Sequence, residues 1–218
     1  MSYLLNLSST PGSSVTKEFD PPLDETIQVK ADCGVLLSPE EEAAWVVPRL
    51  LRISERHRKG GAPAILGWLT GPFLVCEVIQ QKLESLAPGS CRFKSFEIRG
   101  LSEKLRDQSY GTYYWVFPPR LNAVAIEETD FTKGRGSGGY KRSAGRISLL
   151  PDTRCVIDPK IVANHHLWRV PDDYGTDPDD PASVGSSAYF CSNELRDFIK
   201  TERLDGWSFD KKCVNKTT

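Results

Sequence analysis

The stretch Ala188-Tyr-Phe-Cys-Ser-Asn-Glu-Leu-Arg-Asp-Phe-Ile-Lys-Thr-Glu-Arg-Leu-Asp-Gly-Trp-Ser-Phe209 decides the fold, because it has the pattern of a strand, a capped helix and a second strand. Ser192 is a favourable N-cap residue for the helix. Leu195, Phe198 and Ile199 then recur at i, i+3 and i+4, which makes one helix face apolar. This face is predicted to pack on a core.

The end of the same stretch predicts the second strand. Gly206 readily adopts a left-handed conformation, and such a residue after the helix ends the helix. Trp207 and Phe209 alternate with Ser208, so both aromatic side chains lie on the same side of a strand. We therefore expect Phe198 and Trp207 to be buried.

A second segment, residues 73–98, follows the same order of elements. Its sequence predicts a strand ending at Cys76, a helix carrying Ile79, Leu83 and Leu86, a Pro88-Gly89 stop and a strand containing Phe93. The similar spacing in residues 73–98 and 188–209 suggests a duplicated strand-helix-strand unit, although two copies are too few for a repeat array.

The remaining elements before residue 130 are predicted from local signals. Residues 2–7 have the pattern of a strand and residues 8–26 that of a surface loop. Ser38-Pro39 is a clear helix start, Pro48 interrupts that helix, and a second helix is expected over Arg49–Arg58. Leu50, Leu51 and Ile53 would be its inward residues. The strand-forming runs 113–117 and 121–126 suggest a β-hairpin or a meander.

The last part of the chain contains further short elements. We expect a strand within 147–157, a helical turn over 160–163, a strand at 167–170 and a long loop at 171–187. Strands and helices therefore mix without strict alternation. This favours an α+β fold with a mixed, mainly antiparallel sheet and packed helices, in a single domain spanning residues 1–218.

Composition excludes several classes of protein. With 39% hydrophobic residues in 218, the chain can bury a proper core. Its 28 basic and 29 acidic side chains give a net charge of −1, so it lacks the general field of a nucleic-acid binder. The sequence shows neither a signal peptide nor a membrane span, and its six cysteines form no CxxC pair. We therefore expect a cytoplasmic protein with free thiols.

Two loops of opposite charge are the candidate binding segments. Residues 133–146 contain five basic residues, five glycines and no acid. Such a loop can hold phosphate, but no helix start follows it, and a solvated loop is the plainer interpretation. The second loop carries six candidate contact residues: Asp172, Asp173, Tyr174, Asp177, Asp179 and Asp180. It lacks the calcium-loop spacing, so the alternatives are a solvated loop or a docking surface for a basic partner.

No signature of catalysis or of a metal site stands out. His165 and His166 with Cys155 and Cys191 have the right atoms for zinc, but adjacent histidines on an extended segment point to opposite faces. No GxSxG motif or catalytic acid pair is present. We expect no catalytic residue, no metal and no cofactor. The competing hypotheses are a phosphate- or nucleic-acid-handling enzyme that uses loop 133–146 and a metal-stabilised structural domain.

Five segments resemble one known family. The sequence is similar to bacterial polymorphic-toxin immunity proteins of the immunity-protein-eleven type over about residues 65–210, whereas residues 1–60 match only loosely. The resemblance rests on the segments Tyr113-Tyr-Trp-Val-Phe117, Leu121 to Glu127, His166-Leu-Trp-Arg-Val170, Tyr189-Phe-Cys-Ser-Asn-Glu-Leu-Arg-Asp-Phe-Ile199 and Leu204-Asp-Gly-Trp-Ser-Phe209.

The resemblance implies a non-enzymatic antitoxin. Such a protein binds the toxin domain of a secreted or contact-delivered effector in a one-to-one complex and protects the producing cell. Residues 172–180 are the expected contact loop, because toxins that act on nucleic acids or nucleotides usually have a basic cleft. No nucleic-acid or membrane partner is expected.

Overall fold

The computed structural model shows two compact units. Unit 1 comprises Met1–Asn6, Pro118–Lys200 and Ser208–Thr218, and unit 2 comprises Leu7–Phe117 and Thr201–Trp207. Each unit is treated by itself, and the expectation of a single domain stays a prediction. The structure describes residues 2–7, 17–22, 40, 49–53, 64–66, 74–125, 128–129, 155–169 and 189–216.

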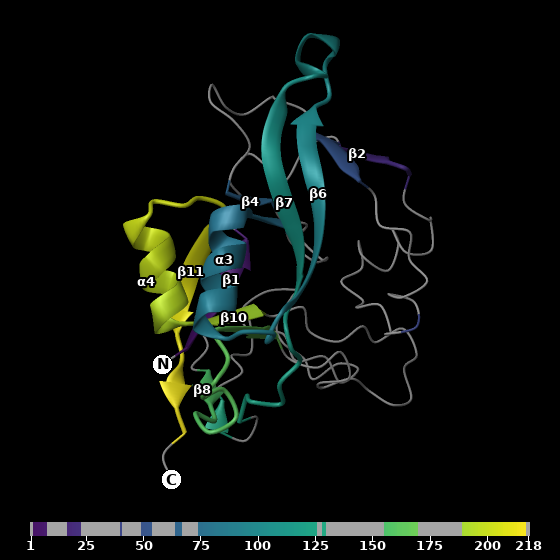
Figure 1. Ribbon diagram of the computed structural model, residues 1–218. Helices are drawn as coiled ribbons and strands as arrows, with labels where there is room; N and C mark the ends of the chain where they lie inside the picture. Colours follow the sequence, from purple (N-terminus) through teal and green to yellow (C-terminus); the bar gives the residue numbers. More distant parts are fainter. Residues whose placement is uncertain are drawn as a thin grey trace, which may run out of the picture. The chain divides into compact units, whose positions relative to one another are not determined.

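Unit 2 is built on a six-stranded mixed sheet with the order β2-β3-β6-β7-β5-β4 (Figure 1). All neighbours pair antiparallel except β3 and β6, which are parallel. The long strands β6 and β7 form a hairpin whose turn contains the 3₁₀ helix η1 (Glu103–Leu105). The strands are β2 (Lys17–Asp20), β3 (Leu50–Ile53), β4 (Ile65–Leu66), β5 (Leu74–Cys76), β6 (Arg92–Gly100) and β7 (Ser109–Phe117).

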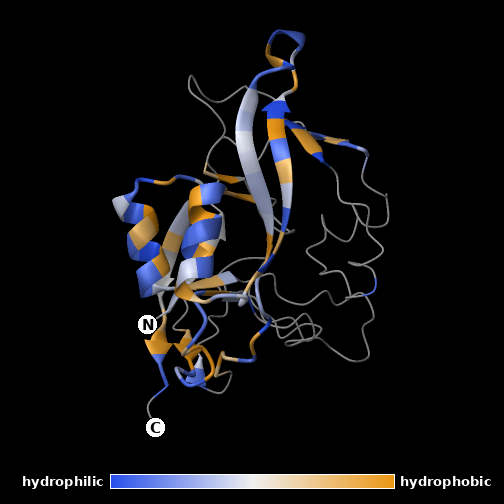
Figure 2. Ribbon diagram, viewed as in Figure 1, coloured by the Kyte–Doolittle hydropathy of each residue, from blue (hydrophilic) through white to orange (hydrophobic). Residues whose placement is uncertain are grey.

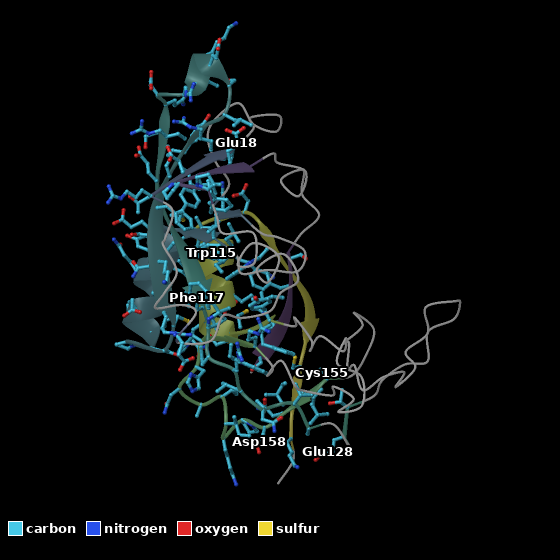
Figure 3. The ribbon with its side chains drawn as sticks, turned by 90° about the vertical axis from the view of Figure 1, so that its right-hand side faces the viewer. Glu18, Trp115, Phe117, Glu128, Cys155 and Asp158 are labelled. Atoms are coloured by element: carbon cyan, nitrogen blue, oxygen red, sulfur yellow. The ribbon has the colours of Figure 1, made fainter. Side chains whose placement is uncertain are left out.

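One face of this sheet carries the core of unit 2. Successive side chains along a strand alternate between faces, and Figure 2 shows hydrophobic and hydrophilic residues alternating along β6. Trp115 is fully buried at the centre of the core, and Figure 3 shows it on β7 beside Phe117. The buried cluster consists of Leu51, Ile53, Leu74, Phe96, Ile98, Tyr113, Trp115 and Phe117.

Helix α3 (Glu77–Leu86) contacts β5 and β7. Its buried residues Ile79 and Leu83 are one turn apart, as an amphipathic helix requires. Val75 and Val116 are also buried but lie outside the core cluster, on strand positions that alternate with it. The helix therefore covers the β5–β7 part of the second sheet face.

Unit 1 contains a four-stranded sheet with the order β11-β1-β10-β9. β10 is its inner strand and pairs antiparallel with both β1 and β9. A separate parallel pair joins β12 (Val214–Asn215) to β8 (Val156–Ile157). The four strands of the larger sheet are β1 (Ser2–Leu7), β9 (Leu167–Arg169), β10 (Tyr189–Ser192) and β11 (Trp207–Lys212).

Helix α4 (Asn193–Thr201) follows β10 directly. The Leu195 backbone N–H donates to the Ser192 hydroxyl oxygen over 3.2 Å, so the expected N-cap is confirmed. Leu195 and Ile199 are buried. Phe198 is only half-buried, and its expected burial was wrong because it lies beside the inward stripe and not within it. Trp207 is buried as expected.

The two strand-helix-strand units share their topology as well as their order. In unit 2 the strands before and after α3, β5 and β6, flank β7. The strands before and after α4, β10 and β11, flank β1 in the same way. The predicted α+β fold, with a unit at 73–98 echoed at 188–209, is thus confirmed.

The helix expected over Arg49–Arg58 was wrong in its described part. Leu50–Ile53 is strand β3, with Leu51 and Ile53 buried and Leu50 and Arg52 half-buried. A short run of this kind fits either a helix or a strand by its pattern. Pairing with β2 on one side and β6 on the other decides for the strand. Strand β2 likewise falls within the loop expected at 8–26.

The expected hairpin between 113–117 and 121–126 was also wrong. Both edges of β7 are already paired, one with β5 and the other with β6. Residues 121–125 belong instead to unit 1, where the Leu121 N–H donates to the Arg169 carbonyl over 2.8 Å. The expected strands at 2–7, within 147–157 and at 167–170 correspond to β1, β8 and β9.

The different burial of two α4 residues leads to a stability prediction. We expect Leu195→Ala to lower the free energy of unfolding by about 2–5 kcal/mol, because it leaves a cavity in a fully buried position. Phe198→Ala should cost clearly less, since Phe198 keeps part of its surface in water. Urea denaturation of the two variants measures the difference. An equal or larger loss for Phe198→Ala would contradict this packing of α4.

Candidate interaction surface

The predicted acidic contact loop lies outside the described residues, including Asp172, Asp173, Tyr174, Asp177, Asp179 and Asp180. Its attachment points in unit 1 are described. The chain leaves β9 at Arg169 and returns to β10 at Tyr189, and these two residues are direct partners in the antiparallel pair. The strands before and after this segment are therefore neighbours in the sheet of unit 1.

Where these two strands end, a buried arginine lies over an aromatic ring. Arg169 is fully buried, and its guanidinium carbon lies 5.6 Å from the centre of the Tyr189 ring. A cation over an aromatic ring is stabilised, and more so when water is excluded. Next to this contact, the rings of Trp168 and Phe190 stack with their centres 4.2 Å apart. The described residues on both sides of the segment are thus densely packed in unit 1.

The basic loop 133–146 also lies outside the described residues. The undescribed segment that contains it starts after Thr129, whose hydroxyl oxygen accepts the Val156 N–H over 3.1 Å. Val124 and Ile157 form an antiparallel bridge at the same place. Val156, the first strand residue described after this segment, begins strand β8, so the described flank has no helix N-terminus at which phosphate would bind.

His166, Ser192 and Glu194 form a polar cluster at the start of α4. His166 Nδ1 lies 2.8 Å from Ser192 Oγ and 3.8 Å from Glu194 Oε2. A catalytic triad needs its serine and its acid on different ring nitrogens, whereas both partners here face Nδ1. Ser192 Oγ also accepts the Leu195 N–H. The cluster therefore caps the helix.

The electrostatics of Glu194 agree with a capping role. Its own backbone N–H and the Ser192 hydroxyl, followed by the charge of His166, lower the pKa of the Glu194 carboxyl. Carboxylates are favoured in the first turn of a helix, where the dipole is positive. The same contacts that hold Glu194 ionised thus stabilise the start of α4.

The candidate zinc ligands are not brought together in the described part of the chain. Cys191 is fully buried on β10, and burial raises the pKa of its thiol. Cys155 is buried in the hydrophobic cluster around Trp168. Within the residues that the structure describes, no three His, Cys, Asp or Glu side chains are grouped as metal ligands. These two thiols serve as small apolar residues.

The part of the second sheet face in unit 2 that α3 does not cover is polar. We call it the arginine face and define it by Arg52 of β3, Glu97 and Arg99 of β6, and Ser109 and Thr112 of β7. The pairing register puts Arg52 opposite Arg99, Arg99 opposite Ser109, and Glu97 opposite Thr112. All five are half-buried or exposed.

A β-bulge in β7 shapes this face. The register shifts between Glu97 and Arg99, and Gly111 in the bulge has a φ of 96°. A bulge lets two strand residues oppose one and changes which face a side chain meets. It keeps both Ser109 and Thr112 on the arginine face.

Glu97 and Arg99 hold each other in place. Arg99 Nη2 donates to Glu97 Oε2 over 3.0 Å. The Arg99 guanidinium and the Ser109 hydroxyl lower the pKa of the Glu97 carboxyl. Both side chains keep about a third of their surface exposed, 34% for Arg99 and 37% for Glu97. The pair is therefore ordered and open to solvent.

Arg52 fixes the turn of the hairpin. Its Nη1 donates to the carbonyls of Arg106 at 3.0 Å and Gly100 at 3.4 Å.

Sequence reasoning missed the arginine face, because Arg52 was assigned to a helix. The alternation of polar and apolar residues along β6 was the available signal for an open sheet face.

Comparison with known protein families gives a match over most of the chain. The sequence pattern of the immunity protein family Imm11 fits residues 47–213, more than half of the chain. The chain belongs to the Imm11 immunity protein family. The expected family resemblance is thus confirmed, and it begins earlier than residue 65. A search of curated proteins finds no match.

The Imm11 match includes both candidate surfaces. It covers the acidic segment 172–180 and all five residues of the arginine face, and it leaves out β1, β2 and β12. In the described part of the chain, no helix is long and apolar enough to cross a membrane.

Proposed function

We propose that this Imm11 protein binds a cognate secreted antibacterial toxin in a one-to-one complex and so protects the cell that produces both. The family match over residues 47–213 carries the proposal. The protein acts without catalysis and in the cytoplasm, where it meets toxin delivered by a competing cell. The setting is a polymorphic-toxin system of interbacterial competition.

Two features of unit 1 support binding as the means of neutralisation. The acidic loop is attached at the paired residues Arg169 and Tyr189, which are buried. Anchored ends reduce the freedom that a loop loses on binding. Its five carboxylates and Tyr174 suit a basic cleft that also accepts an aromatic anchor.

Co-expression tests the function directly. The toxin is taken as the C-terminal domain of the large secreted protein encoded next to this chain. We expect cells that express this domain to survive only when the immunity protein is present, and the two purified proteins to elute together in equal amounts. Death of the co-expressing cells, with both proteins made at full length, would refute the proposal.

The acidic loop has its own test. Changing Asp172, Asp173, Asp177, Asp179 and Asp180 to asparagine should slow association with the toxin domain by about tenfold or more at low salt, because opposite charges speed the encounter. Stopped-flow kinetics at rising salt should show the difference shrink.

The control compares equal changes of charge. Asp179→Asn/Asp180→Asn removes two charges from the loop, and Glu77→Gln/Glu202→Gln removes two from exposed positions in unit 2. Only the loop pair should slow association. Equal rates for the two variants would remove the loop from the interface.

A further inference from the structure

We propose that the arginine face of unit 2 is a second toxin-binding surface, on which Arg52 and Arg99 receive a carboxylate side chain of the toxin domain. The inference rests on the proposed function and names a contact and its chemistry. A stable complex needs about 20–30 residues from each partner. The nine positions of loop 172–180 are too few, so other surfaces must take part.

The first argument is the placement of two arginines side by side. Arg52 and Arg99 occupy directly paired positions of the parallel strands β3 and β6, on the same face. Like charges in directly opposite positions destabilise a sheet. One guanidinium pairs with Glu97, and the other binds backbone carbonyls. Glu18 of β2 also lies opposite Arg52, so two carboxylates, Glu18 and Glu97, accompany the two positive charges at this half-exposed position.

The second argument is the number of donors left over. A guanidinium has five N–H groups arranged to meet a carboxylate in two places. The contacts within the described residues involve one nitrogen of each group, Nη2 of Arg99 and Nη1 of Arg52. Nε of Arg99 is buried without a partner, so the N–H groups that suit an oxygen pair supplied from outside are those at the ends of the two guanidiniums.

The third argument is rigidity. Arg52 is tied to the hairpin turn through the Arg106 carbonyl, and Arg99 is tied to β6 through Glu97. Figure 1 shows the turn of this hairpin beyond the ends of β2 and β3, and Figure 3 places Glu18 of β2 near the same end. Preorganised side chains lose little freedom on binding. The face is thus prepared to recognise a carboxylate in a fixed position.

The test measures dissociation of a catalytically inactivated form of the toxin domain from immunity-protein variants. Arg52→Gln and Arg99→Gln should each weaken the complex by about tenfold or more, mainly through faster dissociation, because a buried toxin carboxylate loses its partner. Arg92→Gln makes the same charge change at the exposed start of β6. It should leave the affinity within about twofold.

A further variant removes no native arginine contact. Thr112→Glu puts a carboxylate on the arginine face at an exposed strand position, where it would compete for the two guanidiniums. It should weaken binding as well, while thermal unfolding confirms that the variant is folded. Arg99→Lys keeps the charge and should recover part of the affinity lost in Arg99→Gln.

The outcomes separate this inference from the proposed function. If the unaltered protein does not bind the toxin domain, the proposed function fails. If it binds, and folded Arg99→Gln and Thr112→Glu bind equally well, the arginine face is not an interface. If Arg52 and Arg99 are needed to bind labelled DNA but not the toxin domain, the carboxylate assignment is wrong.

Discussion

Replacing Gly206 by alanine is expected to lower the free energy of unfolding by about 3–5 kcal/mol. The residue has a φ of 108°, which side chains of L-amino acids rarely adopt. A Cβ atom there would lie 2.3 Å from the Ile65 carbonyl oxygen and 2.7 Å from Ile65 Cβ. Neither the backbone angle nor the contact can relax without moving the chain.

Hydrogen bonds also hold the turn around Gly206 in place. The Ala64 N–H donates to Asp205 Oδ1 over 2.8 Å, and the Ala64 carbonyl accepts the Cys76 N–H over 2.9 Å. Displacing the turn to fit a methyl group would therefore disturb the pairing of β4 with β5 in unit 2. Because the turn and the strand pair are linked in this way, a single methyl group should lower the free energy of unfolding by several kcal/mol.

Gly89→Ala is the matched control in the same unit. Its φ of 71° is also positive, but a Cβ atom added there would meet nothing within 4 Å. Gly89→Ala should lower the free energy of unfolding by about 1–2 kcal/mol, because of the backbone conformation alone. Urea denaturation of both variants isolates the steric part. Equal losses at the two glycines would contradict the close approach of Gly206 to Ile65.

Trp115→Ala is expected to cost about 3–5 kcal/mol, because it empties the centre of the unit 2 core. The indole is fully buried. Its ring centre lies 6.1 Å from that of Phe19, 5.7 Å from Phe96 and 6.1 Å from Phe117. Aromatic pairs at such distances add stability beyond the area that they bury.

Tyr114→Ala provides the comparison on the same strand. Tyr114 is half-buried and points to the opposite face of β7, so its loss should be less than half that of Trp115→Ala. The same denaturation curves test the single-domain prediction. A single domain gives one transition that shifts as a whole, whereas independent units would give two, of which Trp115→Ala moves one. Little change in any transition would show that Trp115 is not central to the core.

Local signals were enough to identify both strand-helix-strand units. Ser192 caps α4 because its hydroxyl reaches a backbone N–H three residues ahead. Leu195 and Ile199 are buried because their spacing puts them on one side of the helix. The same spacing included Phe198 in the apolar face, and only the packing of the helix showed that Phe198 lies at its margin.

Of the candidate surfaces, sequence reasoning proposed the acidic and basic segments, which stay predictions, and missed the sheet face. The acidic loop is visible because its charges are neighbours in the chain. Arg52 and Arg99 are far apart in the sequence, and a pairing register brings them together. No local pattern contains that register, since it depends on which strand becomes the neighbour of β6.

The sequence by itself determined the α+β class, the two amphipathic helices, the Ser192 cap of α4, the Pro88-Gly89 stop after α3 and the membership of the Imm11 family. These depend on contacts within a few residues or on the order of motifs along the chain. Only the tertiary structure decided that Leu50–Ile53 is a strand and that β7 pairs with β5 and β6 rather than with residues 121–126. Such pairings are decided by competition between distant segments for the hydrogen-bonding edges of a strand, and short apolar runs fit several partners equally well.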